Sequence, residues 1–268
     1  MHPPVAGVAH RQHVALVNIR AEVPQAGLQR HDGVAEQLGC YRIGRGGIGM
    51  IVHPASLAAG GTRKKRMITV WGYSPSGNCW KVSTILRLTG RDFRWVETDS
   101  NAGATQTPGY LARNPNGKVP MVELDGGEIV TESAAILCHF AEATPFLPPA
   151  GLERTRVMEW LFFEQYSHEP YIAVARNIVT YLRQADTQAE RLTGCMRNGA
   201  KALDIMERRL ATHDWLAGDS LTIADIALCG YTQAADEGGF DLARWSGVQA
   251  WIARVLATPD VEPLPRPA

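Results

Sequence analysis

Two short stretches of this chain combine residue types and spacing suited to holding a small peptide. The first, Asn114–Pro120, reads as a tight turn that ends in a Val-Pro pair. Pro120 has no N–H and interrupts a sheet edge, and a cis X-Pro bond would turn the N–H and C=O of Val119 toward an extended ligand. Glu132 and Ser133 follow at an expected helix start, where backbone N–H groups receive a carboxylate. Together the stretches suggest a peptide ligand with a carboxylate and a free amine.

Hydrophobic periodicity predicts the elements that position these residues. From Met67 onward, short runs of apolar and β-branched residues indicate strands, and apolar residues at helical spacing indicate helices. The expected strands are Ile68–Gly72, Phe93–Glu97, Pro120–Leu124 and Glu128–Val130, and the expected helices are Cys79–Thr89 and Ser133–Glu142. The sequence Asp125-Gly126-Gly127 is typical of a hairpin turn between the last two strands.

The rest of the chain reads as helix. A linker rich in proline precedes Leu152, and the segment 153–181 is expected to form one long helix. One buried stripe of a further helix is predicted at Leu192, Met196, Leu203, Met206 and Leu210. The sequence Thr222-Ile223-Ala224-Asp225 is a capping box, in which the Thr222 hydroxyl and the Asp225 carboxylate each accept a backbone N–H at the helix start.

Three separated motifs resemble those of the cytosolic glutathione transferases. They are Ser76–Val82, the block from Lys118-Val119-Pro120 to Glu132-Ser133, and Thr222–Asp225. The resemblance extends from Met67 to about Pro263 and implies an α/β plus all-α architecture. A thioredoxin-like domain with a mixed four-stranded sheet is expected over residues 67–144, and a helical-bundle domain over residues 152–263. In that family the capping box lies in a buried helix, so its role here is folding.

The resemblance also implies that glutathione binds as a co-substrate and that its thiol is activated. A free thiol has a pKa near ~8.5, so a donor at the positive end of a helix must favour the thiolate. Ser76 stands six residues before Val82, as in the serine-type theta and zeta classes. Cys79 aligns roughly with the catalytic cysteine of the bacterial beta class, and Asn78 offers an amide donor. Tyr73, which a tyrosine-type enzyme would use, lies before the turn and is the weakest candidate.

Five further residues correspond to glutathione contacts in the family. The backbone of Val119, beside Pro120, would pair with the cysteinyl part of the tripeptide. Lys118 would face the glycine carboxylate. Glu132 and Ser133 would hold the amine and carboxylate of the γ-glutamyl group.

The electrophile is expected between the first loop, Ser74–Asn78, and the helix 153–181. Polar and aromatic candidates on that helix are Tyr166, His168, Tyr171 and Arg176. His168 precedes Glu169-Pro170 and is expected to mark a helix kink more than to act as an acid or base. The sequence leaves the class of electrophile open, and the histidines and cysteines lack the spacing of a metal site.

Composition limits the partners of the chain. The formal net charge is zero, so neither nucleic acid nor an anionic membrane is indicated, and no apolar run approaches the ~20 residues of a membrane span. The five cysteines are odd in number and scattered, which is typical of reduced thiols in a cytoplasmic protein. The resemblance further implies a homodimer.

Residues 1–66 differ from the rest because they lack sustained periodicity and end in the basic run Arg63–Arg66. They contain no continuous apolar core of the kind that a secretory signal needs. We expect a disordered extension or a misassigned start, since Met67 directly precedes the first strand.

The sequence supports three functional hypotheses. The first is a glutathione transferase of the serine type, in which Ser76 activates the thiol and the thiolate attacks a small electrophile. The second is a glutathione-dependent thiol reductase or peroxidase that works through Cys79. The third is a non-catalytic binding protein on the same fold, because fold alone does not dictate function.

Overall fold

A computed structural model describes residues 67–267, and the extension expected over residues 1–66 lies outside them. Four strands form one mixed sheet in the order β2-β1-β3-β4. Their bounds are β1 (Ile68–Gly72), β2 (Phe93–Glu97), β3 (Met121–Glu123) and β4 (Ile129–Thr131). β1 pairs in parallel with β2 and antiparallel with β3, and β3 and β4 form an antiparallel hairpin. This sheet confirms the predicted thioredoxin-like domain.

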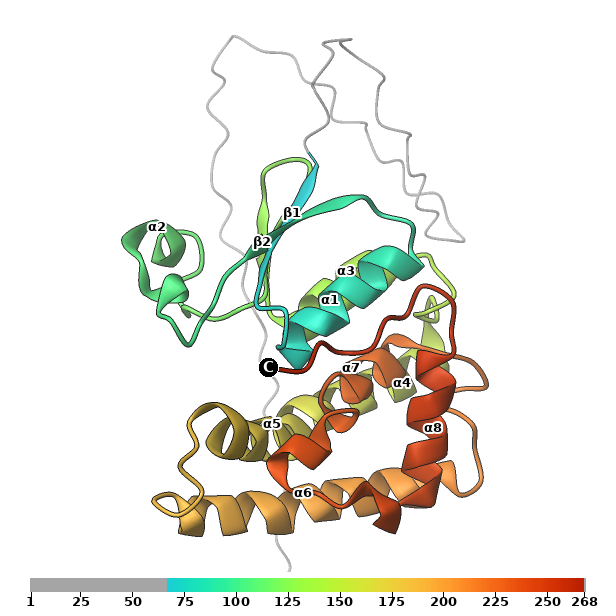
Figure 1. The fold of residues 1–268 in the computed structure, drawn as a ribbon. Helices are drawn as coiled ribbons and strands as arrows, with labels where there is room; N and C mark the ends of the chain where they lie inside the picture. The colour runs from blue at the N-terminus through green and yellow to red at the C-terminus, as the bar shows by residue number, and fades with distance from the viewer. Residues whose placement is uncertain (1–66, 268) are drawn as a thin grey trace, which may run out of the picture. The chain divides into compact units, whose positions relative to one another are not determined.

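The helices of this domain flank the sheet, with α1 and α3 side by side on one face and α2 on the other side (Figure 1). They span α1 (Gly77–Leu88), α2 (Pro108–Leu111) and α3 (Ser133–Ala141), and a 3₁₀ turn, η1 (Ala104–Gln106), precedes α2. Helix α1 begins before Cys79, where the sequence placed its start. The reason is that Ser76 is the N-cap and its Oγ accepts the N–H of Cys79 at 3.4 Å.

The second domain is helical, as predicted. Its α-helices are α4 (Gly151–Phe163), α5 (Glu169–Arg176), α6 (Ala189–Leu210), α7 (Ile223–Thr232) and α8 (Ser246–Leu256), with 3₁₀ turns η4 (Ala235–Gly238) and η5 (Leu242–Arg244). The expected single helix over 153–181 is divided by two π-helical segments, η2 (Glu164–His168) and η3 (Asn177–Tyr181). Pro170 lacks the N–H that a regular α-helix would use in the turn after η2, which explains the first irregularity.

Helix α7 forms the centre of the helical domain, and all its residues are buried. The predicted capping box is present at its start, where the Asp225 carboxylate accepts the N–H of Thr222 at 3.0 Å. The same carboxylate accepts the Leu216 N–H and the Trp251 indole N–H, both at 2.9 Å. The motif therefore joins three segments of the domain, in keeping with a folding role.

Helices α1 and α7 approach closely because each carries a glycine at the contact. A Cβ on Gly77 would lie 2.6 Å from the carbonyl oxygen of Gly230, and a Cβ on Gly230 would lie 2.8 Å from that of Gly77. Neither position tolerates a side chain without separating the helices. This contact brings the first turn of α1 against the helical domain. None of the helices between residues 67 and 267 has the length and hydropathy of a membrane-spanning segment.

Candidate functional site

The turn before β3 is held by hydrogen bonds to one carbonyl group. The Lys118 carbonyl oxygen accepts the Tyr110 hydroxyl at 2.6 Å and the Asn114 side-chain amide at 2.7 Å. The next peptide bond, Val119–Pro120, is cis. The turn that the sequence predicted is therefore fixed by α2 on one side, and it presents Val119 at the end of β3 nearest α1.

The N-terminus of α3 lies beside this turn. Glu132, its N-cap, has a φ of 64°, which is uncommon for a residue with a side chain and is often found at functional sites. The Glu132 carboxylate accepts the Asn116 amide at 3.4 Å, while Ser133 is 5% exposed. The free N–H groups of the first helical turn create a positive potential where a carboxylate would bind.

Asn78 in the first turn of α1 connects α3 with the helical domain. Its Oδ1 accepts Ser133 Oγ at 3.1 Å and Lys81 Nζ at 2.7 Å, and its Nδ2 donates to Glu169 Oε1 at 3.3 Å. The nearby Lys81 also forms an ion pair with Glu164 at 2.6 Å, and both side chains are almost fully buried. Burial raises the pKa of Glu164, and the Lys81 ammonium partly offsets that rise.

A cavity of about 100 Å³ lies among these groups. Its lining contains all five residues that the sequence assigned to glutathione, namely Lys118, Val119, Pro120, Glu132 and Ser133. Asn78 also lines it, whereas the other two thiol candidates, Ser76 and Cys79, do not. The helical domain contributes Gln165 and Glu169, which sequence reasoning missed. Their spacing of four residues, which places both on one helix face, was the available signal.

The two other candidates for thiol activation have structural contacts. Ser76 is the N-cap of α1, and its hydroxyl lies in hydrogen-bonding reach of Tyr231. Burial raises the pKa of Tyr231, and the contact with Ser76 offsets part of that rise. Cys79 is 0% exposed, and its Sγ accepts the N–H of Tyr73 at 3.3 Å. Burial raises the pKa of the Cys79 thiol to about 12, the opposite of what a nucleophilic cysteine requires.

The four residues expected to line an electrophile pocket differ widely in exposure. Tyr166 is 82% exposed, whereas His168 and Arg176 are buried, and Tyr171 is half-buried. His168 Nε2 lies 2.9 Å from Thr232 Oγ1, and burial lowers the pKa of His168 to about 3. The π-helical segments η2 and η3 interrupt the expected single helix, and the sequence pattern did not indicate them.

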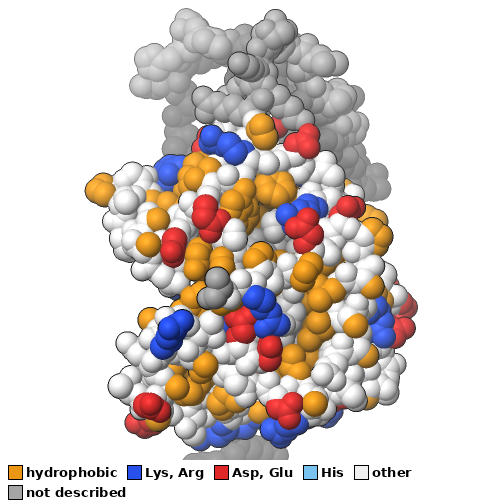
Figure 2. All heavy atoms as spheres, viewed as in Figure 1, with side chains coloured by type: hydrophobic (Ala, Val, Ile, Leu, Met, Phe, Trp, Pro, Cys, Tyr) orange, Lys and Arg blue, Asp and Glu red, His pale blue; other side chains and the backbone are white. Residues whose placement is uncertain are grey.

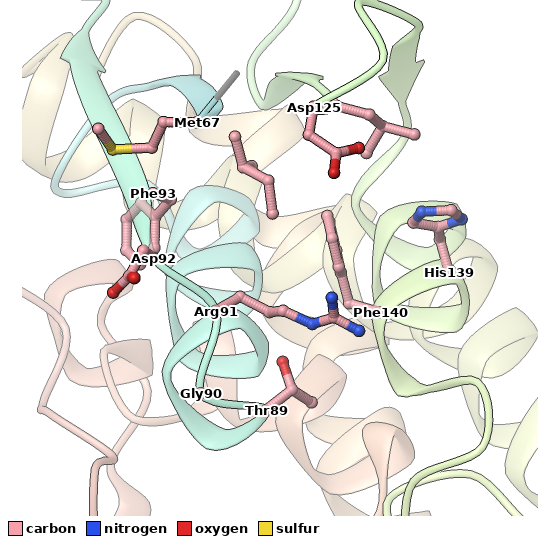
Figure 3. Close-up of a pocket in the computed structure, with 11 residues that line it drawn as sticks. Met67, Thr89, Gly90, Arg91, Asp92, Phe93, Asp125, His139 and Phe140 are labelled. Carbon is pink, nitrogen blue, oxygen red and sulfur yellow. The ribbon is translucent and has the colours of Figure 1, made fainter. Parts of the chain in front are cut away.

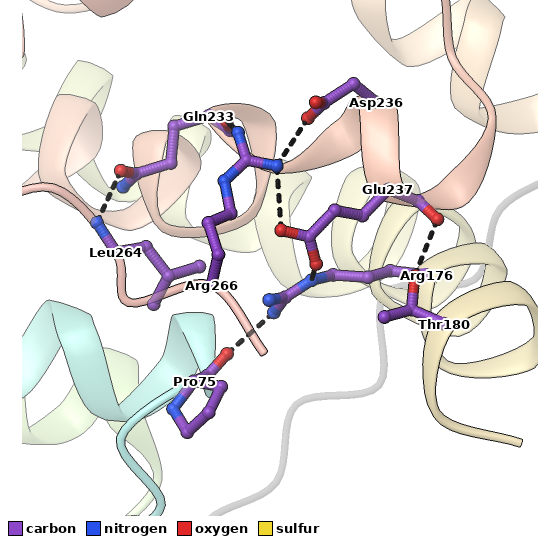
Figure 4. A network of polar contacts seen from close by, with 8 residues as sticks. All are labelled: Pro75, Arg176, Thr180, Gln233, Asp236, Glu237, Leu264 and Arg266. Carbon is purple, nitrogen blue, oxygen red and sulfur yellow. Dashed lines mark hydrogen bonds and ion pairs between the residues drawn. The ribbon is translucent and has the colours of Figure 1, made fainter. Parts of the chain in front are cut away.

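Arg176 joins the first loop to the end of the chain (Figure 4). Its guanidinium donates to the Pro75 carbonyl at 2.6 Å and to Glu237 at 2.7 Å, and Glu237 in turn pairs with Arg266 at 2.7 Å. Figure 2 shows basic and acidic side chains side by side in the middle of this face, where the domains meet. Arg176 therefore has a structural role outside the cavity that Asn78 lines, through its Nε and Nη1, while its Nη2 is buried without a hydrogen-bond partner.

A larger cavity, of about 850 Å³, lies at the opposite end of the first domain (Figure 3). Its lining includes the start of β1 and the ends of α1 and α3, with Arg91, Asp125 and His139 among the polar side chains. None of the residues assigned to glutathione lines it. Among residues 67–267, no group of three or more His, Cys, Asp or Glu side chains is placed to hold a metal ion.

Comparison with known families identifies both domains. Residues 75–143 match the glutathione S-transferase N-terminal domain, and residues 172–259 match the glutathione S-transferase C-terminal domain. The chain therefore belongs to the glutathione S-transferase family, as the motifs predicted.

Relatives in this family carry different names. A crystal structure of a glutathione S-transferase from Xanthobacter autotrophicus Py2 is 56% identical, covers 74% of this chain and 97% of that chain, and superposes with a TM-score of 0.72. Glutathione S-transferase 3 of Zea mays is 32% identical, over 75% of this chain and 96% of the maize protein. The disulfide-bond oxidoreductase YfcG of Escherichia coli K12 is 28% identical, over 70% of this chain and 89% of YfcG.

Proposed function

We propose that the chain is an enzyme that binds glutathione in the cavity beside Asn78 and activates its thiol for attack on a small electrophile. The observation that carries the proposal is the convergence of five expected contact residues and one amide donor on a single cavity. These groups come from α1, the turn before β3, the start of α3 and the helical domain. Membership of the glutathione S-transferase family supports the same ligand.

The contacts follow from the chemistry of the tripeptide. The N-terminus of α3, with Glu132 and Ser133, would receive the carboxylate and amine of the γ-glutamyl group. The backbone of Val119 would pair with the cysteinyl peptide groups, and Lys118 would face the glycine carboxylate. With these ends fixed, the thiol would point toward the first turn of α1.

Among the three candidates, we favour Asn78 as the donor to the thiolate. Asn78 lines the cavity, whereas the Ser76 hydroxyl caps α1 and the Cys79 thiol is buried and protonated. An amide N–H aimed at sulfur, together with the positive end of α1, would stabilise the anion relative to the thiol. The proposed chemistry is then direct displacement or addition by the glutathione thiolate.

A second candidate reaction is thiol–disulfide exchange, which the similarity to a disulfide-bond oxidoreductase favours. Because Cys79 is buried, the nucleophile would be the thiolate of bound glutathione. It would attack one sulfur of a disulfide, form a new S–S bond with it and release the other sulfur as a thiolate. Oxidised glutathione should then leave no adduct on Cys79, as mass spectrometry of the intact chain would reveal.

We further infer that the chain forms a homodimer, as expected from its resemblance to the family. Large apolar side chains are exposed along α4 and the turn after it, with Leu152 66%, Phe162 68% and Tyr166 82% exposed. A second copy would cover such a surface. Light scattering of the eluted chain gives the mass, and a monomer at all concentrations would contradict the inference.

Titration of reduced glutathione into the full chain tests the proposal, with thiolate absorbance followed between about pH 5 and 9. We expect the bound thiol to ionise below its free pKa of ~8.5. Asn78→Ala should abolish most of that shift, and Ser76→Ala and Cys79→Ser serve as matched controls. If the pKa of the bound thiol stays low in Asn78→Ala and returns to its free value in Ser76→Ala, Ser76 is the donor to the thiolate instead of Asn78.

A further inference from the structure

A buried ion pair lies directly beneath the amide that faces the cavity. Lys81 and Glu164 have side-chain exposures of 1% and 0%, and their charged atoms are 2.6 Å apart. Lys81 follows Asn78 by three residues on α1, and Nζ also donates to Asn78 Oδ1 at 2.7 Å. The Tyr231 ring lies 5.6 Å from the ammonium on another side. Lys81 therefore connects a buried acid of the helical domain to a side chain at the cavity.

This contact determines which end of the Asn78 carboxamide faces the ligand. An ammonium has only donors, so the atom 2.7 Å from Lys81 Nζ must be the amide oxygen. Ser133 Oγ donates to the same oxygen at 3.1 Å. The amide nitrogen is then left toward Glu169, which also lines the cavity, and one of its two hydrogens donates to Glu169 while the other is available to a ligand.

Without Lys81, the carboxamide would keep only a weaker preference for this orientation, which comes from Glu169. Ser133 carries a hydroxyl that both donates and accepts, so it can bond to either end of the amide. Glu169 accepts only, and its contact with the amide nitrogen is longer, at 3.3 Å. A flipped amide would present its oxygen to the thiolate, and two electron-rich atoms would then face each other.

We propose that Lys81, held by Glu164, is a positioning residue that fixes the Asn78 amide with its N–H groups toward the glutathione thiol. This inference rests on the proposed function and extends it to a charge that does not touch the ligand. A buried ion pair is weak evidence for stability, because apolar residues of similar volume often replace it at no cost. A positioning role gives this pair a reason to be ionic.

The test removes the pair without leaving a buried charge behind. Lys81→Met/Glu164→Met replaces both partners by flexible apolar side chains and is expected to fold. Arg87→Met is the matched control, since Arg87 lies on the same helix and forms an exposed pair with Glu262. Each variant of the full chain is titrated with reduced glutathione, and the pKa of the bound thiol is measured.

We expect the double variant to bind glutathione, but its affinity for the thiolate should fall at least tenfold relative to its affinity for the thiol. The pKa of the bound thiol would then rise by about one unit. Adding Asn78→Ala to it should then have little further effect, because Lys81 acts only through that amide. A double variant with the wild-type thiol pKa, or additive effects of the two changes, would overturn the inference alone. A wild-type chain that leaves the thiol at its free pKa would overturn the proposed function as well.

Discussion

Two polar networks cross the boundary between the domains, and they differ in what they hold. In the first, Lys81 and Glu164 are buried and lead to the Asn78 side chain at the cavity. In the second, Arg176 holds a backbone carbonyl, that of Pro75, and continues through Glu237 to Arg266, whose side chain is 47% exposed. The first network ends at the Asn78 carboxamide, which a ligand can contact. The second ends at the Pro75 backbone carbonyl, which holds only the path of the chain.

This difference in the group that each network holds distinguishes a charge that serves the ligand site, Lys81, from a charge that serves the fold, Arg176. A donor to a backbone carbonyl fixes the path of the chain, and its removal is felt as lost stability. A donor to a carboxamide oxygen fixes the direction of another donor, and its removal is also felt in ligand chemistry. Burial alone does not distinguish the two cases, because Lys81 and Arg176 are both almost fully buried. The two cases differ in the group that accepts the hydrogen bond, which is a side-chain amide for Lys81 and a backbone carbonyl for Arg176.

The largest effect on stability is expected when one partner of the buried pair is removed. Glu164→Ala leaves the Lys81 ammonium without its carboxylate in the interior, and such changes cost about 3–5 kcal/mol. Urea denaturation measures the free energy of unfolding. Glu159→Ala is the control, since Glu159 pairs with Arg156 on the surface of α4. A loss as small as that of the control would mean that water reaches Lys81.

A smaller loss is expected in the second network. Arg176→Met removes the donors to Pro75 and Glu237, and hydrogen bonds to charged groups contribute about 1.5–3 kcal/mol. Glu237 keeps Arg266 as a partner, which limits the damage. The pKa of bound glutathione should not change, in contrast to the Lys81→Met/Glu164→Met variant. A changed thiol pKa in Arg176→Met would mean that the second network also acts on the ligand.

The sequence predicted the fold and the peptide-facing half of the cavity because those features are local. β1 and β2 have the predicted bounds, and the Val-Pro and Glu-Ser motifs lie next to each other through the β3–β4 hairpin. The helical-domain side was not predictable in the same way. Gln165 in η2 and Glu169 at the start of α5 line the cavity, and their spacing of four residues places them on one helix face without indicating which face meets the first domain.

The same limit applies to thiol activation. Ser76, Asn78 and Cys79 lie within four consecutive residues, and the sequence offered motif spacing but no burial to rank them. The structure assigns different environments to them through contacts with α7 and Glu164, which are distant in sequence. The sequence alone does not single out Lys81, because a lysine on a helix is usually solvated and its partner Glu164 follows 83 residues later.

A pH effect of intermediate size is expected from His168, next to the first network. Its Nε2–H donates to Thr232 Oγ1, since that hydroxyl gives its own proton to the Leu228 carbonyl at 2.6 Å. The folded chain keeps the imidazole neutral with a pKa of about 3, whereas the unfolded chain protonates it below its ordinary value near 6.5. Stability should therefore fall as the pH drops below about 6.5, by about 2 kcal/mol near pH 5.

The control for this prediction is His168→Gln, which can still bond to Thr232 but does not titrate. Urea denaturation of both chains at pH 7.5 and pH 5 gives two differences in unfolding free energy. The wild type should lose about 2 kcal/mol more than the variant between these conditions. Equal losses would show that the imidazole is protonated in the folded state or exchanges with solvent.

The smallest effect is expected at the exposed end of the second network. Arg266→Ala removes the contacts to Asp236 and Glu237 and a hydrogen bond to the Gln233 carbonyl, but exposed ion pairs contribute about 0–1 kcal/mol and weaken in salt. Arg254→Ala, which breaks a similarly exposed pair with Asp214, should cost about the same in urea denaturation. A loss at Arg266 as large as at Arg176 would mean that the end of the chain organises the interior, because Leu264 N–H also bonds to buried Gln233. A small loss of unfolding free energy at Arg266 would mean that Arg176 holds the Pro75 carbonyl without help from Arg266.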